Sequence, residues 1–218
     1  MPRYPDVPMP RCLRAKLSGS RMLRKLPALV LMLIVSGFAA DEFTLYELLP
    51  PETHQFAITY DVPATRQGAQ FFFNPIRPGS AATKERVIER STGKELKFEV
   101  VNGKQAKPTG LVPPDTKDDS QFIKVYLPAP VAKGGETRLR IYKTYTDAAS
   151  YYVKDGQLIF DRPLGIKRNT VVLPQGWELI GSASPAIVST DSDGHIHLSF
   201  VNDRDDQLPV KIIARRLP

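Results

Sequence analysis

Apolar and polar residues alternate with a period of two along most of the chain from Phe43 onward. This alternation is typical of half-buried β-strands, because successive side chains of a strand point to opposite faces. The clearest runs are residues 56–60, 96–100, 123–127, 139–141, 196–200 and 210–214. No window of a dozen residues has the 3.6-residue period of a helix. The nearest case, residues 81–90, is short and charged and fits an edge strand equally well. The pattern predicts an all-β protein.

Turn residues separate these runs. Asp155-Gly156 lies between the apolar segments 151–153 and 158–160, and Asp193-Gly194 lies between 187–188 and 196–200. Glycine in a two-residue turn supplies a positive φ, so each pair predicts a β-hairpin. Asn102-Gly103 predicts a third tight turn. The spacing of strands and turns is typical of an antiparallel β-sandwich with two packed sheets.

The domain boundaries follow from the same pattern. The 20 prolines among 218 residues argue against a helical bundle, because proline breaks helix interiors. Residues 104–120 are polar and contain three prolines, which predicts a surface excursion between strands. Residues 41–218 fit one large sandwich, or two small ones with a seam near residues 146–150.

Three segments between residues 101 and 142 suggest a family. Val101-Asn102-Gly103-Lys104, the run from Ile123 to Val131 and the run from Gly135 to Tyr142 resemble the closing strands of the N-terminal β-domain of gluzincin-type aminopeptidases. The phrase from Val172 to Trp177 is similar to one in secreted bacterial β-sandwiches of unknown role. The resemblance implies a β-sandwich. It does not imply peptidase activity, because the His-Glu-x-x-His zinc motif of that family is absent and no catalytic-sized domain follows.

The N-terminal residues have the three parts of a secretion signal. Arg24-Lys25 precedes an apolar run over residues 26–35, and small residues at 36–40 follow it. Residues 26–40 are fewer than the ~20 needed to span a bilayer. We expect cleavage after Ala39 or Ala40, with an uncleaved anchor as the alternative. The chain then divides into a basic, proline-containing extension (1–21), a signal or anchor (22–40) and a β-domain (41–218). The true start is Met1 or Met22.

The charge distribution argues against nucleic-acid binding. The net charge is +7, and residues 1–25 carry seven basic side chains and one acidic side chain. The remaining chain is therefore nearly neutral and lacks the basic excess that binds phosphate backbones. The only cysteine, Cys12, precedes the signal, so the exported part has no disulfide and no thiol nucleophile. We expect an exported protein, periplasmic or extracellular.

Candidate chemical sites are sparse. His195 and His197 share one face of a predicted strand, but a metal site needs further ligands, for which the sequence offers His54 and Asp191 or Asp193. The acidic turns 191–194 and 203–206 lack the full calcium-loop pattern. Residues 181–185 lack the glycine of a nucleophile elbow. We therefore expect solvent-facing histidines, no bound metal, no cofactor and no enzymatic activity, although pairs of carboxylates leave a hydrolase open.

The segment 160–169 is the candidate binding loop, since it carries three cations between apolar strands. Loops with exposed arginines often display binding residues. With nearby aromatic residues, the predicted surface comprises Arg162, Lys167, Arg168, Tyr151, Tyr152 and Trp177. The alternative is a solvated loop in which Arg162 pairs with Asp161 or a neighbouring sheet.

These observations predict a non-catalytic protein-interaction or scaffold module, one form of which is an accessory subunit of an envelope or membrane complex. A secreted hydrolase or a glycan-binding module is the alternative. We expect a protein partner in the envelope or membrane, and membrane contact only if residues 22–40 stay uncleaved. An anionic glycan or lipid head groups are other ligands that the predicted surface could accept.

Overall fold

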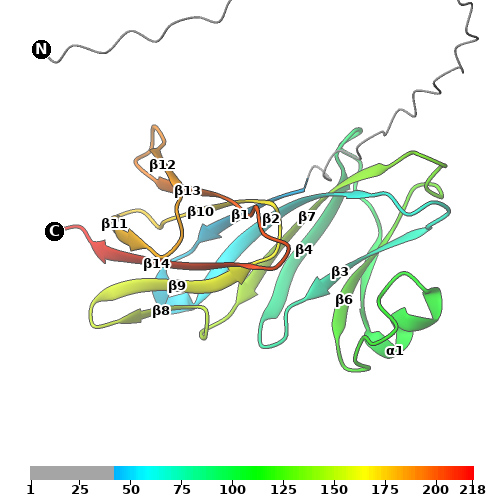
Figure 1. Ribbon diagram of the computed structural model, residues 1–218, viewed down its shortest axis with the longest axis horizontal. Helices are drawn as coiled ribbons and strands as arrows, with labels where there is room; N and C mark the ends of the chain where they lie inside the picture. The colour runs from blue at the N-terminus through cyan, green and yellow to red at the C-terminus, as the bar shows by residue number, and fades with distance from the viewer. Residues whose placement is uncertain (1–41) are drawn as a thin grey trace, which may run out of the picture. The chain divides into compact units, whose positions relative to one another are not determined.

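A computed structural model describes residues 42–218, so the predicted extension, signal and cleavage site lie outside the described residues. Fourteen strands form three sheets in this part of the chain (Figure 1). In spatial order, the seven-stranded sheet contains β12 (Ile187–Thr190), β13 (Ile196–Val201), β10 (Arg168–Val172), β1 (Phe43–Leu48), β2 (Gln55–Ala64), β7 (Thr137–Thr146) and β4 (Ala81–Glu89).

Two smaller sheets accompany it. The four-stranded sheet has the order β11 (Trp177–Ser182), β14 (Leu208–Arg216), β9 (Gln157–Leu164) and β8 (Tyr151–Lys154). The three-stranded sheet has the order β3 (Phe71–Ile76), β6 (Gln121–Tyr126) and β5 (Phe98–Asn102). The short helices are η1 (Pro51–Thr53), α1 (Gly103–Ala106) and η2 (Lys107–Thr109). No helix within residues 42–218 is long and apolar enough to cross a bilayer.

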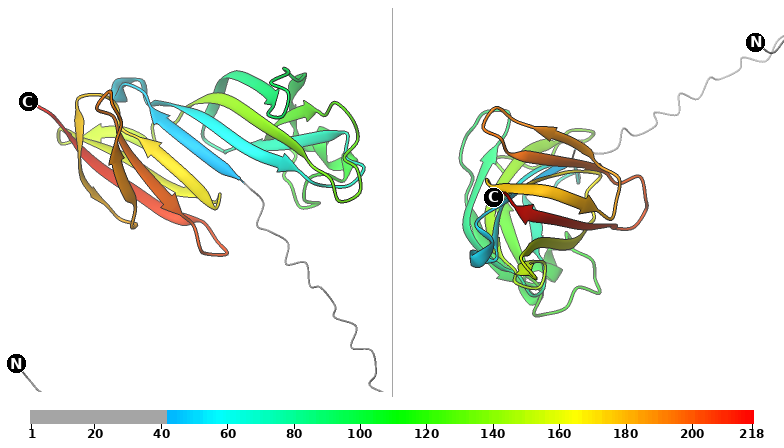
Figure 2. Two further views of the ribbon diagram at one scale, coloured as in Figure 1. Left: turned by 90° about the horizontal axis from the view of Figure 1, so that it is seen from above. Right: turned by 90° about the vertical axis from the view of Figure 1, so that its left-hand side faces the viewer.

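The predicted all-β class with packed antiparallel sheets is confirmed, and the structure differs from the expected two sheets in the number of sheets and in one strand pair. There are three sheets, and β1 pairs parallel with β10, with Phe43 opposite Arg168. Figure 2 shows the four-stranded sheet at one end of the described unit and the three-stranded sheet at the other, with the seven-stranded sheet extending between them. Pairing of residues this distant leaves no trace in the local pattern.

Both predicted hairpins are confirmed. β8 pairs with β9 across Asp155-Gly156, and β12 pairs with β13 across Asp193-Gly194. Residues 81–90 do contain an edge strand, β4. The third predicted turn is wrong, because Asn102 caps helix α1 instead. The Asn102 side chain accepts a hydrogen bond from Gln105 N at 3.0 Å, and the Gln105 side chain accepts one from Asn102 N at 3.0 Å.

Aromatic rings join the two largest sheets. Phe56 on β2 is fully buried, and its ring centroid lies 5.6 Å from that of Phe160 on β9, at an interplanar angle of 89°. Tyr145 and Tyr151 pack edge-on against the same Phe56 ring at 6.0 and 6.4 Å. Such pairs add about 0.5–1.5 kcal/mol each beyond the area they bury. The main core therefore lies between the seven- and four-stranded sheets, and the same cluster continues to Ile123 and Val125 of the three-stranded sheet.

Candidate functional site

The predicted binding loop is wrong in its secondary structure. Strand β9 continues to Leu164, so most of the segment is sheet rather than loop. Pro163 is tolerated because it lies directly opposite Pro209 of β14. Neither residue has a backbone N–H, so this pair occupies a position without backbone hydrogen bonds.

Arg162 belongs to the core and not to an exposed surface. Only 4% of it is exposed, and its Nη1 lies 2.8 Å from Asp147 Oδ2. Its guanidinium carbon lies 5.2 Å from the Phe56 ring centroid and 5.3 Å from that of Tyr145. Pairing with a neighbouring element was the alternative left open by the sequence, although the partner is Asp147 rather than Asp161.

The Arg162–Asp147 pair is held by further hydrogen bonds. Ser80 Oγ donates to Asp147 Oδ2 at 3.0 Å, and the backbone N of Ser150 donates to Asp147 Oδ1 at 3.1 Å. Burial alone would raise the pKa of Asp147, but the hydrogen bonds from Ser150 and Ser80 and the charge of Arg162 hold it below its usual value. Burial lowers the pKa of Arg162. The pair ties the segment before β8 to β9.

Tyr151 is also buried. It has no exposed surface, and its hydroxyl donates to the backbone oxygen of Leu49 at 2.5 Å. Burial raises the pKa of this hydroxyl. Arg162 and Tyr151 therefore cannot form part of a surface that meets a partner, and that part of the prediction is corrected.

The four remaining residues of the predicted surface lie on different elements. Tyr152 on β8 and Trp177 on β11 are half-buried, and these strands are the two opposite edges of the four-stranded sheet. Lys167, just before β10, and Arg168, the first residue of β10, are exposed. The structure does not bring the six residues together, and partner binding by the four exposed or half-buried ones stays a prediction.

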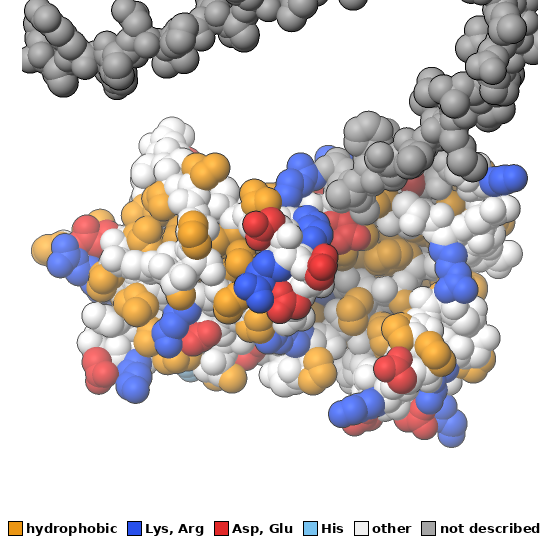
Figure 3. All heavy atoms as spheres, in the orientation of Figure 1, with side chains coloured by type: hydrophobic (Ala, Val, Ile, Leu, Met, Phe, Trp, Pro, Cys, Tyr) orange, Lys and Arg blue, Asp and Glu red, His pale blue; other side chains and the backbone are white. Residues whose placement is uncertain are grey.

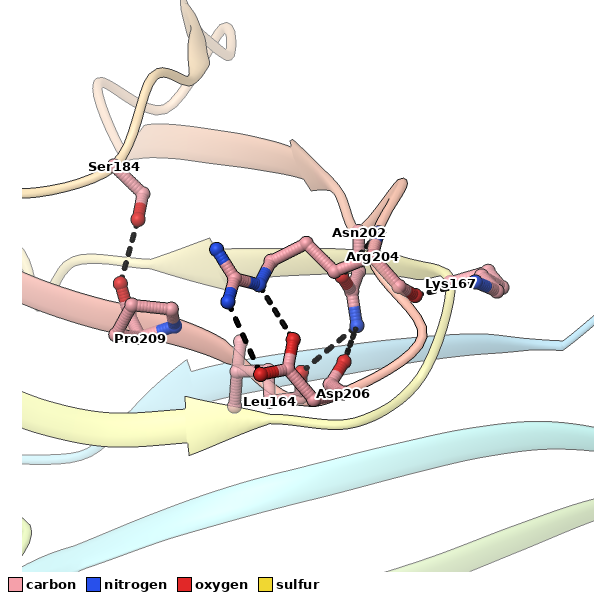
Figure 4. A network of polar contacts seen from close by, with 7 residues as sticks. All are labelled: Leu164, Lys167, Ser184, Asn202, Arg204, Asp206 and Pro209. Atoms are coloured by element: carbon pink, nitrogen blue, oxygen red, sulfur yellow. Dashed lines mark hydrogen bonds and ion pairs between the residues drawn. The ribbon is translucent and has the colours of Figure 1, made fainter.

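Lys167 helps to fix the loop between β13 and β14 (Figure 4). Its Nζ donates to the backbone oxygen of Arg204 at 2.7 Å, and Arg204 forms two bonds to the Asp206 carboxylate at 2.5 and 3.0 Å. Asn202 donates to the backbone oxygens of Asp206 at 2.8 Å and Leu164 at 3.4 Å. The acidic turn 203–206 is thus organised by an internal ion pair and an asparagine.

The histidine pair belongs to a small polar cluster. His197 Nε2 lies 3.1 Å and His195 Nδ1 lies 3.4 Å from the same oxygen, Asp191 Oδ2. The hydrogen bond with His197, followed by that from the His195 backbone, lowers the pKa of Asp191 to about 2. Both histidines are half-buried rather than fully solvent-facing. His54 instead bonds the backbone oxygen of Tyr151, at 2.9 Å.

No group of three His, Cys, Asp or Glu side chains in residues 42–218 is arranged to hold a metal ion. The polar cluster of Asp191, His195 and His197 borders a hollow of about 700 Å³, which is also lined by residues of β1 and β10 and by the ends of β11 and β14. Leu45, Val172 and Trp177 form part of its apolar wall. Trp177 is the one predicted surface residue in this hollow.

The hollow lies next to an exposed edge strand, β12. All four β12 residues are exposed, including Ile187 at 73% and Val188 at 51%. Val201 on the neighbouring β13 is 69% exposed. In the view of Figure 3, hydrophobic side chains are gathered over the β12 and β13 region. This apolar edge was missed from the sequence because the predicted hairpin alone does not reveal which strand lies at a sheet edge.

No protein family and no curated protein matches the sequence. Solved structures do resemble the fold. The M1 zinc metallopeptidase of Deinococcus radiodurans matches at a TM-score of 0.48 and 13% identity, over 80% of this chain and 41% of that one. The aminopeptidase N family protein of Idiomarina loihiensis matches at 0.45 and 11% identity, over 80% of this chain and 29% of that one. The structural resemblance to aminopeptidases predicted from the sequence is confirmed, and the chain spans less than half of either solved chain.

Proposed function

We propose that this protein is an exported, non-catalytic interaction module whose edge strand β12 pairs with an extended segment of a partner protein. The observation that supports it most directly is the character of β12, Ile187-Val188-Ser189-Thr190, which is exposed, uncharged and apolar in part. An unprotected edge offers a row of backbone N–H and C=O groups to another strand.

The other five sheet edges of the described residues all carry a feature that discourages strand addition. Such features are charged side chains, proline or a bulge. On these five edge strands the protecting residues are Lys154 on β8, Glu178 on β11, Glu99 on β5, Pro75 on β3, and Lys84 with a bulge on β4. β12 has none of these features. Proteins protect edges that must stay free, so the exception favours an edge that is used.

Two of the exposed apolar side chains near β12, Ile187 and Val201, lie on one face of the sheet. Ile187 lies opposite Ser199, and Val201 follows two residues later on the same face of β13. An added strand would hydrogen-bond through its backbone and place alternate side chains beside Ile187 and Val201. A partner segment with alternating apolar residues fits this surface.

Charge near β12 indicates a partner with basic residues, in preference to a second copy of this chain. The acidic side chains around the hollow are Glu47, Glu52, Asp191 and Asp193, against Arg216 and the two histidines. If two β12 strands paired antiparallel, the Asp191–Asp193 turn of one copy would lie beside Ala183-Ser184-Pro185-Ala186 of the other. That segment has no basic residue and one proline. A different protein with a basic flank complements the turn better.

Site-specific crosslinking tests the proposal. A photo-crosslinking amino acid would replace Ser189 on β12 in one full-length variant and Val153 on edge strand β8 in another, in cells of the native host. We expect a crosslinked product from position 189 only, whose peptide map shows an extended partner segment. The double substitution Ile187→Lys with Val188→Lys should abolish it, whereas Val100→Lys, at a 50% exposed site on β5, should not.

Several outcomes would overturn the proposal. These are equal crosslinking at positions 189 and 153, crosslinks only between copies of this chain, or a product that survives the double substitution. Turnover in a peptidase, esterase or glycosidase panel that disappears on substitution of one Ser, His or acidic residue would reject the non-catalytic assignment. Binding of glycans to the Trp177 side of the hollow would favour the glycan-binding alternative.

A further inference from the structure

Strand β7 turns a lysine toward the core. Leu139, Ile141, Lys143 and Tyr145 share one face of this strand, and Lys143 is only 6% exposed. Its Nζ donates to Asn74 Oδ1 at 2.5 Å and lies 4.7 Å from the ring centroid of Tyr145. A buried ammonium with one neutral acceptor is poorly compensated for its lost hydration. Core packing alone does not explain this residue.

Two arginines accompany Lys143. Arg162 is paired with Asp147, but Arg77 donates through Nη1 to the backbone oxygen of Pro163 at 3.2 Å. No carboxylate within residues 42–218 lies within 4.0 Å of the Lys143 or Arg77 side-chain nitrogens. Among these three cations, only Arg162 is therefore paired with a carboxylate of the described residues.

These cations line one cavity of about 480 Å³ between β1, β2, β7 and the segments that follow β3 and β9. Its other walls include the rings of Tyr46, Tyr60 and Tyr145 and the side chain of Ile166. Thr44 also lines it. That residue is 3% exposed, and its hydroxyl has no hydrogen-bond partner in the protein. Buried hydroxyl groups normally have a partner, so an unpaired one at a cavity indicates a polar ligand.

We propose that this cavity binds a small organic carboxylate, with its carboxylate near Lys143 and Arg77, which both lie beside Tyr145, and its body along the tyrosine rings toward Thr44. Arg77 and the protonated form of Lys143 favour an anion, and a carboxylate accepts several hydrogen bonds from such donors. Ligand pockets commonly measure about 300–1,000 Å³, so this cavity accommodates a body beyond the charged group. The site is separate from β12 and does not rest on the proposed function.

The charges around Lys143 support an anion. Burial, and then the charge of Arg162 on β9, lower its pKa to about 7, while Glu85 at the β4 bulge opposes the shift. Arg77 and the tyrosines Tyr46, Tyr60 and Tyr145 are the other titratable groups of the cavity wall. A bound carboxylate would favour the protonated amine and so raise the pKa of Lys143. Binding should therefore be accompanied by proton uptake above pH 7.

Titration of the full-length protein with phenylacetate and hexanoate, followed by calorimetry and by NMR of the lysine side chains, tests this inference. Phenylacetamide serves as the neutral isostere. We expect both carboxylates to bind, the amide to bind at least tenfold more weakly, and the pKa of Lys143 to rise on binding. Lys143→Met should weaken carboxylate binding at least tenfold. Lys154→Met, at an exposed site, should leave it unchanged.

The variant Lys143→Met is suited to this test because it keeps the length of the side chain and removes a buried charge, so folding is preserved. Thermal unfolding of each variant checks that point. The inference is rejected if neither carboxylate binds at millimolar concentration, if the amide binds equally well, or if Lys143→Met binds like the wild type. Equal affinity for inorganic phosphate would reject a site for organic carboxylates.

Discussion

Lys143 on β7 lies directly opposite Ile58 on β2, on the face of the seven-stranded sheet that forms the core. The register therefore places an amine at a position where the neighbouring pairs are apolar or aromatic, such as Tyr60 with Ile141 and Phe56 with Tyr145. Because Lys143 has a titratable amine at a core position, the stability of the protein should depend on pH.

The first prediction concerns that dependence. The pKa of Lys143 falls from 10.5 to about 7 on folding, so between these values the unfolded chain binds more protons than the folded one. The free energy of unfolding contributed by Lys143 should thus rise with pH over this range, by up to ~1.4 kcal/mol per pH unit. Below about pH 7 the cost of the buried charge should be fully present.

Urea unfolding of the wild type and of Lys143→Met from pH 6 to 10 measures this contribution. Other lysines and the tyrosines also titrate there, so the difference between the two proteins is the relevant quantity. The variant should be more stable at pH 6, and its advantage should shrink as the pH rises. A constant difference across the range would contradict a lowered pKa at Lys143.

The second prediction concerns the buried Arg162–Asp147 pair. Removal of one partner leaves an uncompensated charge, which typically costs 3–5 kcal/mol. We expect Arg162→Met to lose about that much free energy of unfolding. The double variant Arg162→Met with Asp147→Leu should recover part of the loss, because no charge is then left unpaired in the core.

Denaturant titration of the three proteins forms the measurement, and the exposed pair Arg86–Glu95 provides the control. Its side chains are 54% and 69% exposed, so Arg86→Met should cost under ~1 kcal/mol. The wild type should also lose stability as the pH falls through the lowered pKa of Asp147. Equal losses for Arg162→Met and Arg86→Met would refute the structural role of the pair.

Local signals predicted the parts of the fold that depend on neighbouring residues. Asp155 and Gly156 both have positive φ, 51° and 75°, as a tight hairpin turn requires, and their sequence reveals this directly. The parallel pairing of Phe43 with Arg168 had no such signal, because it depends on long-range assembly of the sheet. The number of sheets was therefore mispredicted although the strands were recognised.

The binding surface was mispredicted for a related reason. Leu158, Phe160, Arg162 and Leu164 continue one alternating pattern, which places Arg162 inward. The nearby Pro163 and Gly165 favour a loop, and the three cations of residues 160–169 favour an exposed one. Alternation does contain a usable signal for Arg162 and Lys143, namely a cation at an inward position. The partner that compensates such a cation comes from another element and is not readable locally.

A third prediction concerns export. The small residues at 36–40 after the apolar run favour cleavage, so protein secreted by the native host should begin at Ala40 or Asp41. N-terminal sequencing of the secreted protein provides the measurement. Replacement of Ala39 by a bulky residue, Ala39→Trp, should block cleavage of the signal. An intact chain recovered from the membrane fraction would instead support an uncleaved anchor.

The fourth prediction concerns Gly103, the first residue of helix α1. A Cβ at this position would overlap the backbone oxygen of Lys117, and Lys104 N donates to Asp118 O at 3.3 Å next to it. The overlap involves backbone on both sides, so a side-chain rotation cannot relieve it. Gly103→Ala should therefore separate α1 from residues 117–118 and lower the free energy of unfolding by about 1–3 kcal/mol, the usual range for overpacking.

Gly181→Ala is the matched control, because a Cβ there meets no atom within 4 Å and Gly181 has no positive φ. Comparison of the two unfolding midpoints, with hydrogen exchange over residues 101–122, tests the prediction. An unchanged midpoint and unchanged exchange for Gly103→Ala would show that the close approach of α1 to Lys117 is not needed for stability.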